Sequence, residues 1–166
     1  VALNKIDLPA AEPDLYASEI EQVLGVKASE ILRVSAKTGE GVEALLDKVV
    51  ESVPAPKGDI QMPLQALIFD SHYDQYRGVV SSIRVVNGKI AKGEKIHFMQ
   101  HGSGAIVEEI GVRTPELNSV QSLGAGEVGF LIAGIKDVGE ARSGETVTSS
   151  AEMATVPLDG YREPVS

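Results

Sequence analysis

The chain has 166 residues, a formal net charge of −9 and no cysteine. This charge excludes a global electrostatic attraction to nucleic acid, although local basic patches stay open. Without cysteine there is no disulfide framework or thiolate metal site, which fits a reducing cytosol. No apolar run approaches the roughly 20 residues that span a bilayer, and the N-terminus lacks the pattern of a signal peptide. The chain begins at Val1 inside an expected strand without an initiator Met, so we expect a piece of a longer protein.

The first third of the chain has an α/β pattern. Residues 1–3 and 31–34 are short apolar runs, which are typical of parallel strands with helices on both faces. Helices are expected over 13–24 and 41–52, where apolar residues recur at helical spacing. Strand, helix, strand, helix predicts part of an α/β domain over residues 1–55.

Beyond Pro54 the spacing of apolar residues changes from a helical period to a period of two residues, which predicts an all-β unit. A linker is expected over 56–63, a barrel over 64–150 and an extended linker over 151–166. Within the barrel we expect strands over 64–70, 78–86, 95–99, 104–112, 120–123, 127–133 and 145–148. Many short strands, glycine-rich turns and no helix signal predict a closed antiparallel barrel. Asn87-Gly88 is a strong reverse-turn signal after the second strand.

Two short motifs indicate a guanine pocket. Asn4-Lys5-Ile6-Asp7 follows the first strand, and Ser35-Ala36-Lys37 follows the second. Asp7 would accept two parallel hydrogen bonds from N1 and N2 of guanine, a pair of donors that adenine lacks. The Ala36 N–H would reach guanine O6, and the Lys5 and Lys37 stems would cover the faces of the ring. Either motif alone could be an ordinary surface turn, but their order and separation favour the pocket.

With both motifs and the barrel pattern in place, the chain resembles the translational GTPases over nearly its full length. Beyond the two guanine motifs, the likeness rests on Asn87 to Glu94, Leu64 to Ser71, Tyr73 to Val80, Gly126 to Phe130, Ala133 to Val138 and Gly160 to Pro164. The resemblance implies the C-terminal part of a P-loop GTPase domain, followed by a translation-factor domain II barrel. Residues 151–166 would then lead toward a third domain.

The resemblance also implies an activity for the parent protein, which would hydrolyse GTP on the ribosome and modulate elongation in the bacterial cytoplasm. The chain itself has no Gly-x-x-x-x-Gly-Lys-Ser/Thr loop and no Asp-x-x-Gly-His segment. Phosphoryl transfer depends on positioning the phosphates and neutralising their charge. We therefore expect contacts to the guanine base of GTP or GDP only, no catalytic residue in this chain, and Mg²⁺ bound by residues of the parent that lie elsewhere.

A basic segment suggests how the barrel would meet a partner. From Arg77 to Lys95 five cations face one acid, a segment charge of +4. The simpler interpretation is a solvated hairpin whose lysines protect an exposed edge. In the translational GTPases this barrel faces the small ribosomal subunit, and cations there would contact rRNA phosphates. We expect Arg77, Lys89, Lys92 and Lys95 to do so, with the turn residues Lys89 and Lys92 ahead of Arg84.

Two other groups of side chains could carry chemistry. Tyr73 and Tyr76, beside Arg77, could stack on bases, but packing at a barrel mouth is favoured. His97 and His101 are four residues apart on a strand and its turn, where that spacing does not converge side chains, so no metal site is expected.

One alternative function stays open. The chain could be a non-enzymatic module whose barrel binds RNA, the ribosome or a protein, with the α/β part as a structural appendage. Helices without their full sheet would expose apolar faces, so self-association is expected. Peripheral membrane association of the parent protein is also left open.

Overall fold

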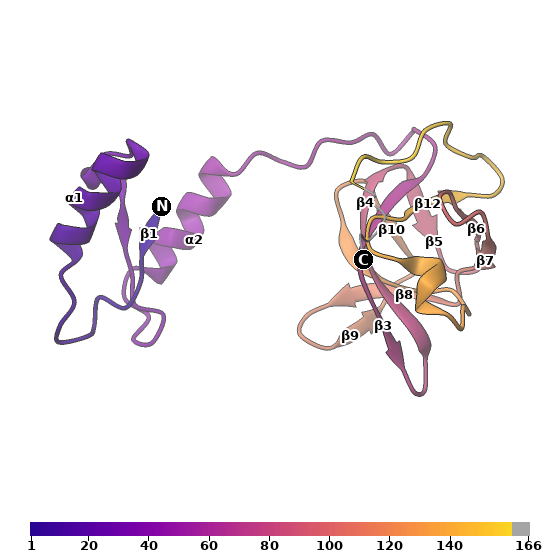
Figure 1. Ribbon diagram of the computed structural model, residues 1–166, viewed down its shortest axis with the longest axis horizontal. Helices are drawn as coiled ribbons and strands as arrows, with labels where there is room; N and C mark the ends of the chain where they lie inside the picture. Colours follow the sequence, from indigo (N-terminus) through magenta and orange to yellow (C-terminus); the bar gives the residue numbers. More distant parts are fainter. Residues whose placement is uncertain (161–166) are drawn as a thin grey trace, which may run out of the picture. The chain divides into compact units, whose positions relative to one another are not determined.

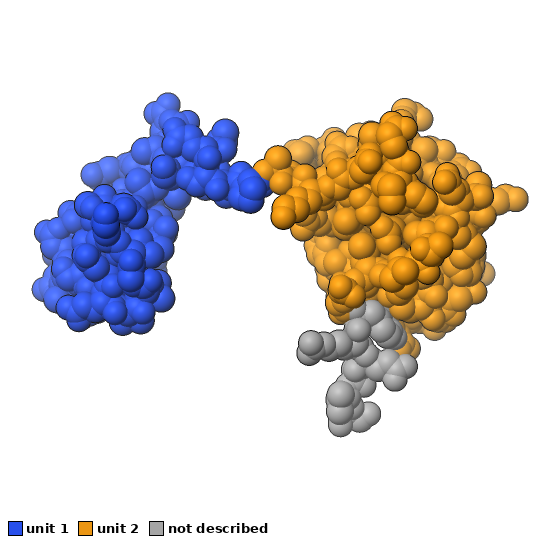
Figure 2. Space-filling view, turned by 90° about the horizontal axis from the view of Figure 1, so that it is seen from above, with its two compact units in different colours: residues 1–54 blue, residues 55–166 orange. Residues whose placement is uncertain are grey.

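A computed structural model describes residues 1–160 of the chain. Tyr161 to Pro164, the end of the last motif shared with the translational GTPases, lie outside the described residues. The structure contains two compact units, Val1–Pro54 and a second that begins at Ala55 (Figure 2). Among the described residues, no helix is both long enough and apolar enough to cross a bilayer.

The first unit is a two-stranded parallel sheet with two α-helices. Its elements are β1 (Ala2–Leu3), α1 (Pro13–Leu24), the short 3-10 helix η1 (Ala28–Glu30), β2 (Leu32–Arg33) and α2 (Val42–Ser52). Helix α1 ends at Gly25, which has a left-handed φ of 69° and donates its N–H to the Glu21 carbonyl at 2.9 Å. Both expected helices are confirmed to within one residue, because their apolar spacing and end signals agree.

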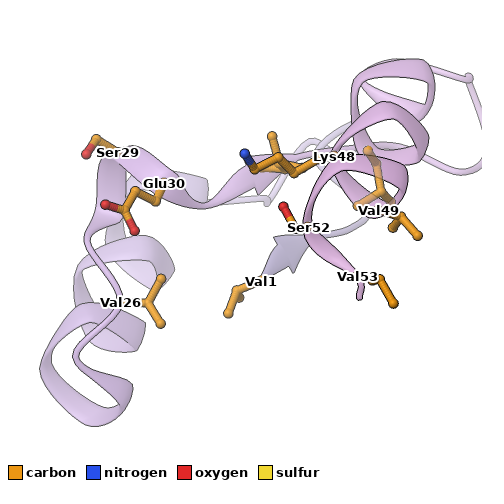
Figure 3. Close-up of a pocket in the computed structure, with 10 residues that line it drawn as sticks. Val1, Val26, Ser29, Glu30, Lys48, Val49, Ser52 and Val53 are labelled. Carbon is orange, nitrogen blue, oxygen red and sulfur yellow. The ribbon is translucent and has the colours of Figure 1, made fainter. Parts of the chain in front are cut away.

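This unit leaves apolar side chains exposed. Val23 and Val50 are about four-fifths exposed, and Leu46 and Val49 about half. A groove of about 720 Å³ lies beside α2 and the loop before β2, and Figure 3 shows Val1, Val49 and Val53 around it. A two-stranded sheet therefore does not cover the helices that flank it.

The second unit is built from ten strands and one short helix among the described residues. These are β3 (Gln65–Asp74), β4 (Gly78–Asn87), β5 (Lys89–Ala91), β6 (Lys95–Phe98), β7 (Gly104–Ile106), β8 (Glu109–Arg113), β9 (Leu117–Ser119), β10 (Ser122–Gly124), β11 (Val128–Ile132), η2 (Val138–Ala141) and β12 (Thr146–Ser149) (Figure 1). Eight of them form an antiparallel sheet in the order β7-β6-β12-β3-β4-β11-β8-β9.

The remaining pair, β5 and β10, closes this sheet into a barrel. The Gly93 N–H after β5 donates to the Val107 carbonyl at 2.8 Å, and the Val120 N–H before β10 donates to the Ile110 carbonyl at 2.9 Å. Fully buried side chains from almost every strand fill the interior, among them Ile68, Ile83, Ile90, Ile96, Phe98, Ile110, Leu123 and Leu131. The predicted α/β part followed by an antiparallel barrel is confirmed.

Several expected details of the barrel are wrong. The single strand expected over 104–112 is two strands, because β7 pairs with β6 whereas β8 pairs with β11. Strands β5 and β9 and helix η2 were not expected, since three or four residues carry no readable period. The Asp137 carboxylate supports η2 by accepting the Gly139 N–H at 2.8 Å.

Asn87-Gly88 is a corner between two strand pairs rather than a hairpin turn. Strand β4 passes through Gly88, at φ 71°, into β5, which pairs with β10 and not with β4. The Gly88 N–H donates to the Asp59 carbonyl at 2.9 Å, so the chain that leads into the barrel stabilises the corner. The dipeptide signals a left-handed residue, but the partner of the next strand depends on distant segments.

Candidate functional site

The two guanine motifs meet at one edge of the first unit. Strands β1 and β2 are parallel, so the loops that follow them leave the sheet at the same end. Two backbone hydrogen bonds hold the loops together, from Val34 N–H to the Leu3 carbonyl at 2.8 Å and from Ile6 N–H to the Val34 carbonyl at 3.4 Å. Hydrogen bonds between the two strand ends therefore fix the place where each motif begins.

Asp7 is held by the buried Ser35. The Ser35 Oγ donates to Asp7 Oδ1 at 2.7 Å and accepts the Thr38 N–H at 3.2 Å, so the hydroxyl is fixed from both sides. An ionised carboxylate offers about four acceptor positions. The bond to Ser35 therefore orients Asp7 and leaves acceptor capacity for the two N–H groups of a purine edge.

Asn4 joins the two motifs through its side-chain oxygen. Its Oδ1 accepts the Lys5 N–H at 2.8 Å and the Ala36 N–H at 3.1 Å. Lys5 has a left-handed φ of 67°, the only such non-glycine residue among residues 1–160. A guanine O6 would have to share or displace the bond between Ala36 and Asn4, a detail that the sequence did not suggest.

These side chains surround one hollow. Its volume is about 320 Å³, and it is lined by Asn4, Lys5, Asp7, Leu8, Ala36 and Lys37. Five of the six expected guanine contacts thus line the same hollow. The sixth, Ser35, does not line it but bonds to Asp7. Leu8 was not expected there, and its position directly after the motif is the signal that could have indicated it.

The four basic residues that are expected to contact RNA fall into two places. Lys92 lies in a turn as expected, but Lys89, also expected in the turn, lies on β5. Lys95 is at the start of β6, and all three are exposed. Arg77 lies in the turn directly before the ten-residue strand β4, whereas the lysines come after it. A strand of that length spans about 30 Å at the usual rise. The Arg77 Nη1 is 3.5 Å from Glu109 Oε1, an acid that partly neutralises its charge. The three lysines lie within seven consecutive residues and are called the lysine cluster below; Arg77 is not part of it.

Arg77 belongs instead to the tip of the β3–β4 hairpin, which projects beyond the rest of the barrel (Figure 1). Tyr76 is 96% exposed and Tyr73 is 60% exposed, so the expectation that these tyrosines pack at the barrel mouth is wrong. The tip extends past the neighbouring strands, and the described part of the chain offers little surface to cover it.

The hairpin tip is nevertheless ordered by hydrogen bonds. Asp74 Oδ1 accepts the N–H groups of Tyr76 at 2.8 Å and Arg77 at 2.9 Å. These bonds, first that of Tyr76 and then that of Arg77, hold the pKa of Asp74 below its ordinary value of 3.8. The turn therefore presents Tyr76 in a defined backbone conformation.

Comparison with known proteins agrees with both units. Residues 78–148 match the family described as elongation factor Tu domain 2. Elongation factor 4 of Bifidobacterium animalis subsp. lactis is 54% identical over 162 residues, which are 98% of this chain and 26% of that protein. Elongation factor 4 of Thermobifida fusca is likewise 54% identical over 98% of this chain. The chain thus spans about a quarter of the length of these relatives.

Solved structures share the fold at lower identity. The bacterial selenocysteine-specific elongation factor EF-Sec has a TM-score of 0.67 at 22% identity, covering 90% of this chain and 26% of that chain. Translation elongation factor SelB from Methanococcus maripaludis has a TM-score of 0.68 at 18% identity, covering 92% and 33%. The resemblance to the translational GTPases is therefore confirmed, and nearly the whole chain matches a segment of elongation factor 4, the family member also called LepA.

Proposed function

We propose that the first unit selects the guanine base of GTP or GDP and that the barrel contacts ribosomal RNA, within a full-length translational GTPase. The observation that carries this proposal is the bond from Ser35 to Asp7 at the edge of the hollow lined by Lys5 and Lys37. A buried hydroxyl that orients a carboxylate toward an open cavity is an arrangement that binding requires and a surface turn does not.

Base selection follows from the donors that each purine presents. Guanine offers N1–H and the N2 amino group side by side, and a carboxylate can accept both. Adenine presents an unprotonated N1 there, which the Asp7 carboxylate would repel. Lys5 and Lys37 both line the hollow, and their aliphatic stems would pack on the faces of the ring.

The chain supplies this recognition without the chemistry of hydrolysis. Its sequence holds no phosphate-binding loop and no Asp-x-x-Gly-His segment, so GTP phosphates and Mg²⁺ would be bound by other parts of the full-length protein. In that protein, hydrolysis would depend on positioning those phosphates. The residues described here would decide which nucleotide is positioned.

The experiment is a change of base specificity in a full-length protein that contains this segment. The unmodified protein should bind GDP and exclude ADP. Asp7→Asn should lose GDP affinity and gain affinity for xanthosine diphosphate, because the Asn amide can donate to the carbonyl at C2 of xanthine. Asp47→Asn, on the exposed side of α2, is the matched control. Retained preference for GDP in Asp7→Asn would show that Asp7 is not the selector.

For the barrel, the exposed cluster of Lys89, Lys92 and Lys95 supports contact with RNA phosphates. Such contacts position a protein and carry no sequence information. The exposed Tyr76 supports a second contact at the hairpin tip, where an unpaired base could stack. Together they would orient the barrel on the small ribosomal subunit.

The alternative is a binding module with a structural α/β appendage. The same full-length protein separates the two, because that module would bind ribosomes with no preference for guanine nucleotides over ATP. The location that the family implies is the bacterial cytoplasm. Whether the full-length protein also associates with the membrane surface is tested separately, by vesicle flotation.

We further propose that the isolated chain self-associates through the groove beside α2. Exposed Val49 and Val53 line it, and water-exposed apolar area of this kind favours association. Light scattering should show a mass above that of the monomer, and Val49→Lys should lower it. A monomer at high concentration would contradict this proposal.

A further inference from the structure

Two side-chain amides connect the chain segments that flank the barrel. Asn87 Nδ2 donates to Gln65 Oε1 at 2.8 Å, and both side chains are half-buried. Gln65 begins β3 and Asn87 ends β4. The pair thus lies at the end of the barrel where the chain enters and leaves.

Each amide also bonds to a flanking segment. Asn87 Oδ1 accepts the N–H of Asp59, which lies in the incoming segment (residues 56–63), at 3.0 Å. Gln65 Nε2 donates to the carbonyl of Val156, which lies in the outgoing segment (residues 150–160), at 2.7 Å. Three consecutive hydrogen bonds therefore lead from Asp59 to Val156.

The direction of these bonds is fixed by the backbone at both ends. A backbone N–H can only donate and a carbonyl can only accept. Asp59 therefore requires the oxygen of Asn87, and Val156 requires the nitrogen of Gln65. The remaining Asn87 nitrogen and Gln65 oxygen are then complementary, whereas rotating either amide by 180° would break both of its bonds.

Other contacts fasten each segment to the barrel independently. On the incoming side, the Gly88 N–H donates to the Asp59 carbonyl at 2.9 Å. On the outgoing side, the Ala154 N–H donates to Thr148 Oγ1 at 2.9 Å and the Leu158 N–H to Thr146 Oγ1 at 3.0 Å. Both threonines are fully buried in β12. The amide pair therefore joins two ordered segments, so a change at one has a route to the other.

We infer that the Asn87–Gln65 amide pair couples the incoming and outgoing segments, so that each is more firmly attached when the other is in place. Asn87 fixes the rotation of the Gln65 amide and so aims Nε2 at Val156. Without Asn87 that amide is free to rotate, and the bond to Val156 weakens even though neither of its partners has changed. Coupling of this kind is reciprocal.

The experiment is residue-resolved amide hydrogen exchange on the chain as it stands, with no nucleotide or ribosome. Asn87→Asp keeps the oxygen that accepts from Asp59 but loses the donor to Gln65. It should speed exchange at the Ala154 and Leu158 amides about threefold to tenfold, which corresponds to one hydrogen bond. The hydrogen bonds of these two amides go to Thr148 and Thr146 and not to residue 87, so this readout is indirect. Gln65→Ala should in turn speed exchange at Asp59 and Met62.

Ser71→Ala is the matched control. It removes the side-chain bond from Ser71 to Ser81 between the same two strands, β3 and β4, but touches neither segment, so it should leave exchange at Asp59, Met62, Ala154 and Leu158 unchanged. Exchange at Ile83 and Ile110, in buried strands, reports whether a variant has unfolded. The inference is overturned if Asn87→Asp leaves the outgoing amides unaffected, or if Gln65→Ala changes the outgoing segment alone. Because no nucleotide is involved, such a failure would not bear on guanine recognition.

Discussion

Ser35 Oγ lies 2.7 Å from Asp7 Oδ1 and joins two loops that are 28 residues apart in the sequence. Ser35→Ala removes this donor and also the acceptor for the Thr38 N–H. We expect a loss of about 1–3 kcal/mol in stability of the first unit, because buried polar groups lose their partners. Chemical denaturation measures the loss, and GDP affinity of the full-length protein should fall with it.

Ser29→Ala, at an exposed position of η1, is the control and should change neither quantity. If Ser35→Ala lost stability but kept full GDP affinity, Ser35 would be structural without orienting Asp7.

Lys89→Glu with Lys92→Glu should weaken binding of the full-length protein to ribosomes and flatten its dependence on salt. Each lost phosphate contact lowers the slope of log affinity against log salt by about one. Titration at several salt concentrations measures both effects. Lys136→Glu with Arg142→Glu reverses the same number of exposed charges elsewhere on the barrel. If both double variants weakened ribosome binding equally, the cause would be net charge rather than a specific phosphate contact.

Tyr76→Ala should leave the melting temperature unchanged, because the side chain is 96% exposed. If a base stacks on the ring, Tyr76→Ala in the full-length protein should weaken the free energy of ribosome binding by about 1–3 kcal/mol. Tyr76→Phe should retain most of the affinity. Val128→Ala, a half-exposed position on β11, serves as comparison. A similar loss in Tyr76→Phe would point to the hydroxyl and contradict stacking.

Gly88→Ala should destabilise the barrel by at least about 2 kcal/mol. An added Cβ would lie 2.7 Å from both the Leu64 Cα and the Met62 carbonyl oxygen, and the φ of 71° is unfavourable for alanine. Gly93→Ala shares the left-handed φ but has open space around it, so it should cost only about 1 kcal/mol. Thermal unfolding compares them, and equal losses would show that the contacts with residues 62 and 64 relax.

The turn at the hairpin tip should depend on pH through Asp74. Its pKa is lowered by the Tyr76 and Arg77 N–H bonds, so the stabilisation is complete above 3.8 and is lost as the pH falls through the lowered pKa. The Tyr76 and Arg77 amide shifts should titrate with a midpoint below 3.8. Asp74→Asn should abolish that titration and Asp70→Asn should not. A midpoint at or above the ordinary value would contradict this account.

Much of this fold was readable from local pattern. Helix α1 begins at Pro13 and ends before Gly25 as expected, because its apolar period and both end signals agree. The corner at Asn87 was misread, since whether β5 pairs with β4 or β10 depends on residues far along the chain. Exposure of Tyr76 was missed for a similar reason, because a strand pattern does not show where a hairpin outgrows its neighbours.

The candidate site was also predictable from the sequence only in part. The guanine motifs identified five residues that line one hollow, because parallel strands bring their following loops together. Sequence proximity wrongly grouped Arg77 with Lys89, since the ten-residue strand β4 lies between them. The Gln65–Asn87 pair has no sequence signature, because single amides in unrelated strands become partners only through the register of β3 with β4.

Strand β12 has a consequence for the order in which the protein is made. It is the last strand among residues 1–160, yet it lies between β3 and β6 in the sheet. While the chain is being synthesised, those two strands have unpaired edges until Thr146–Ser149 has emerged, and such edges readily pair with other chains. The barrel therefore cannot assemble strand by strand behind the translating ribosome, because its closure waits for β12.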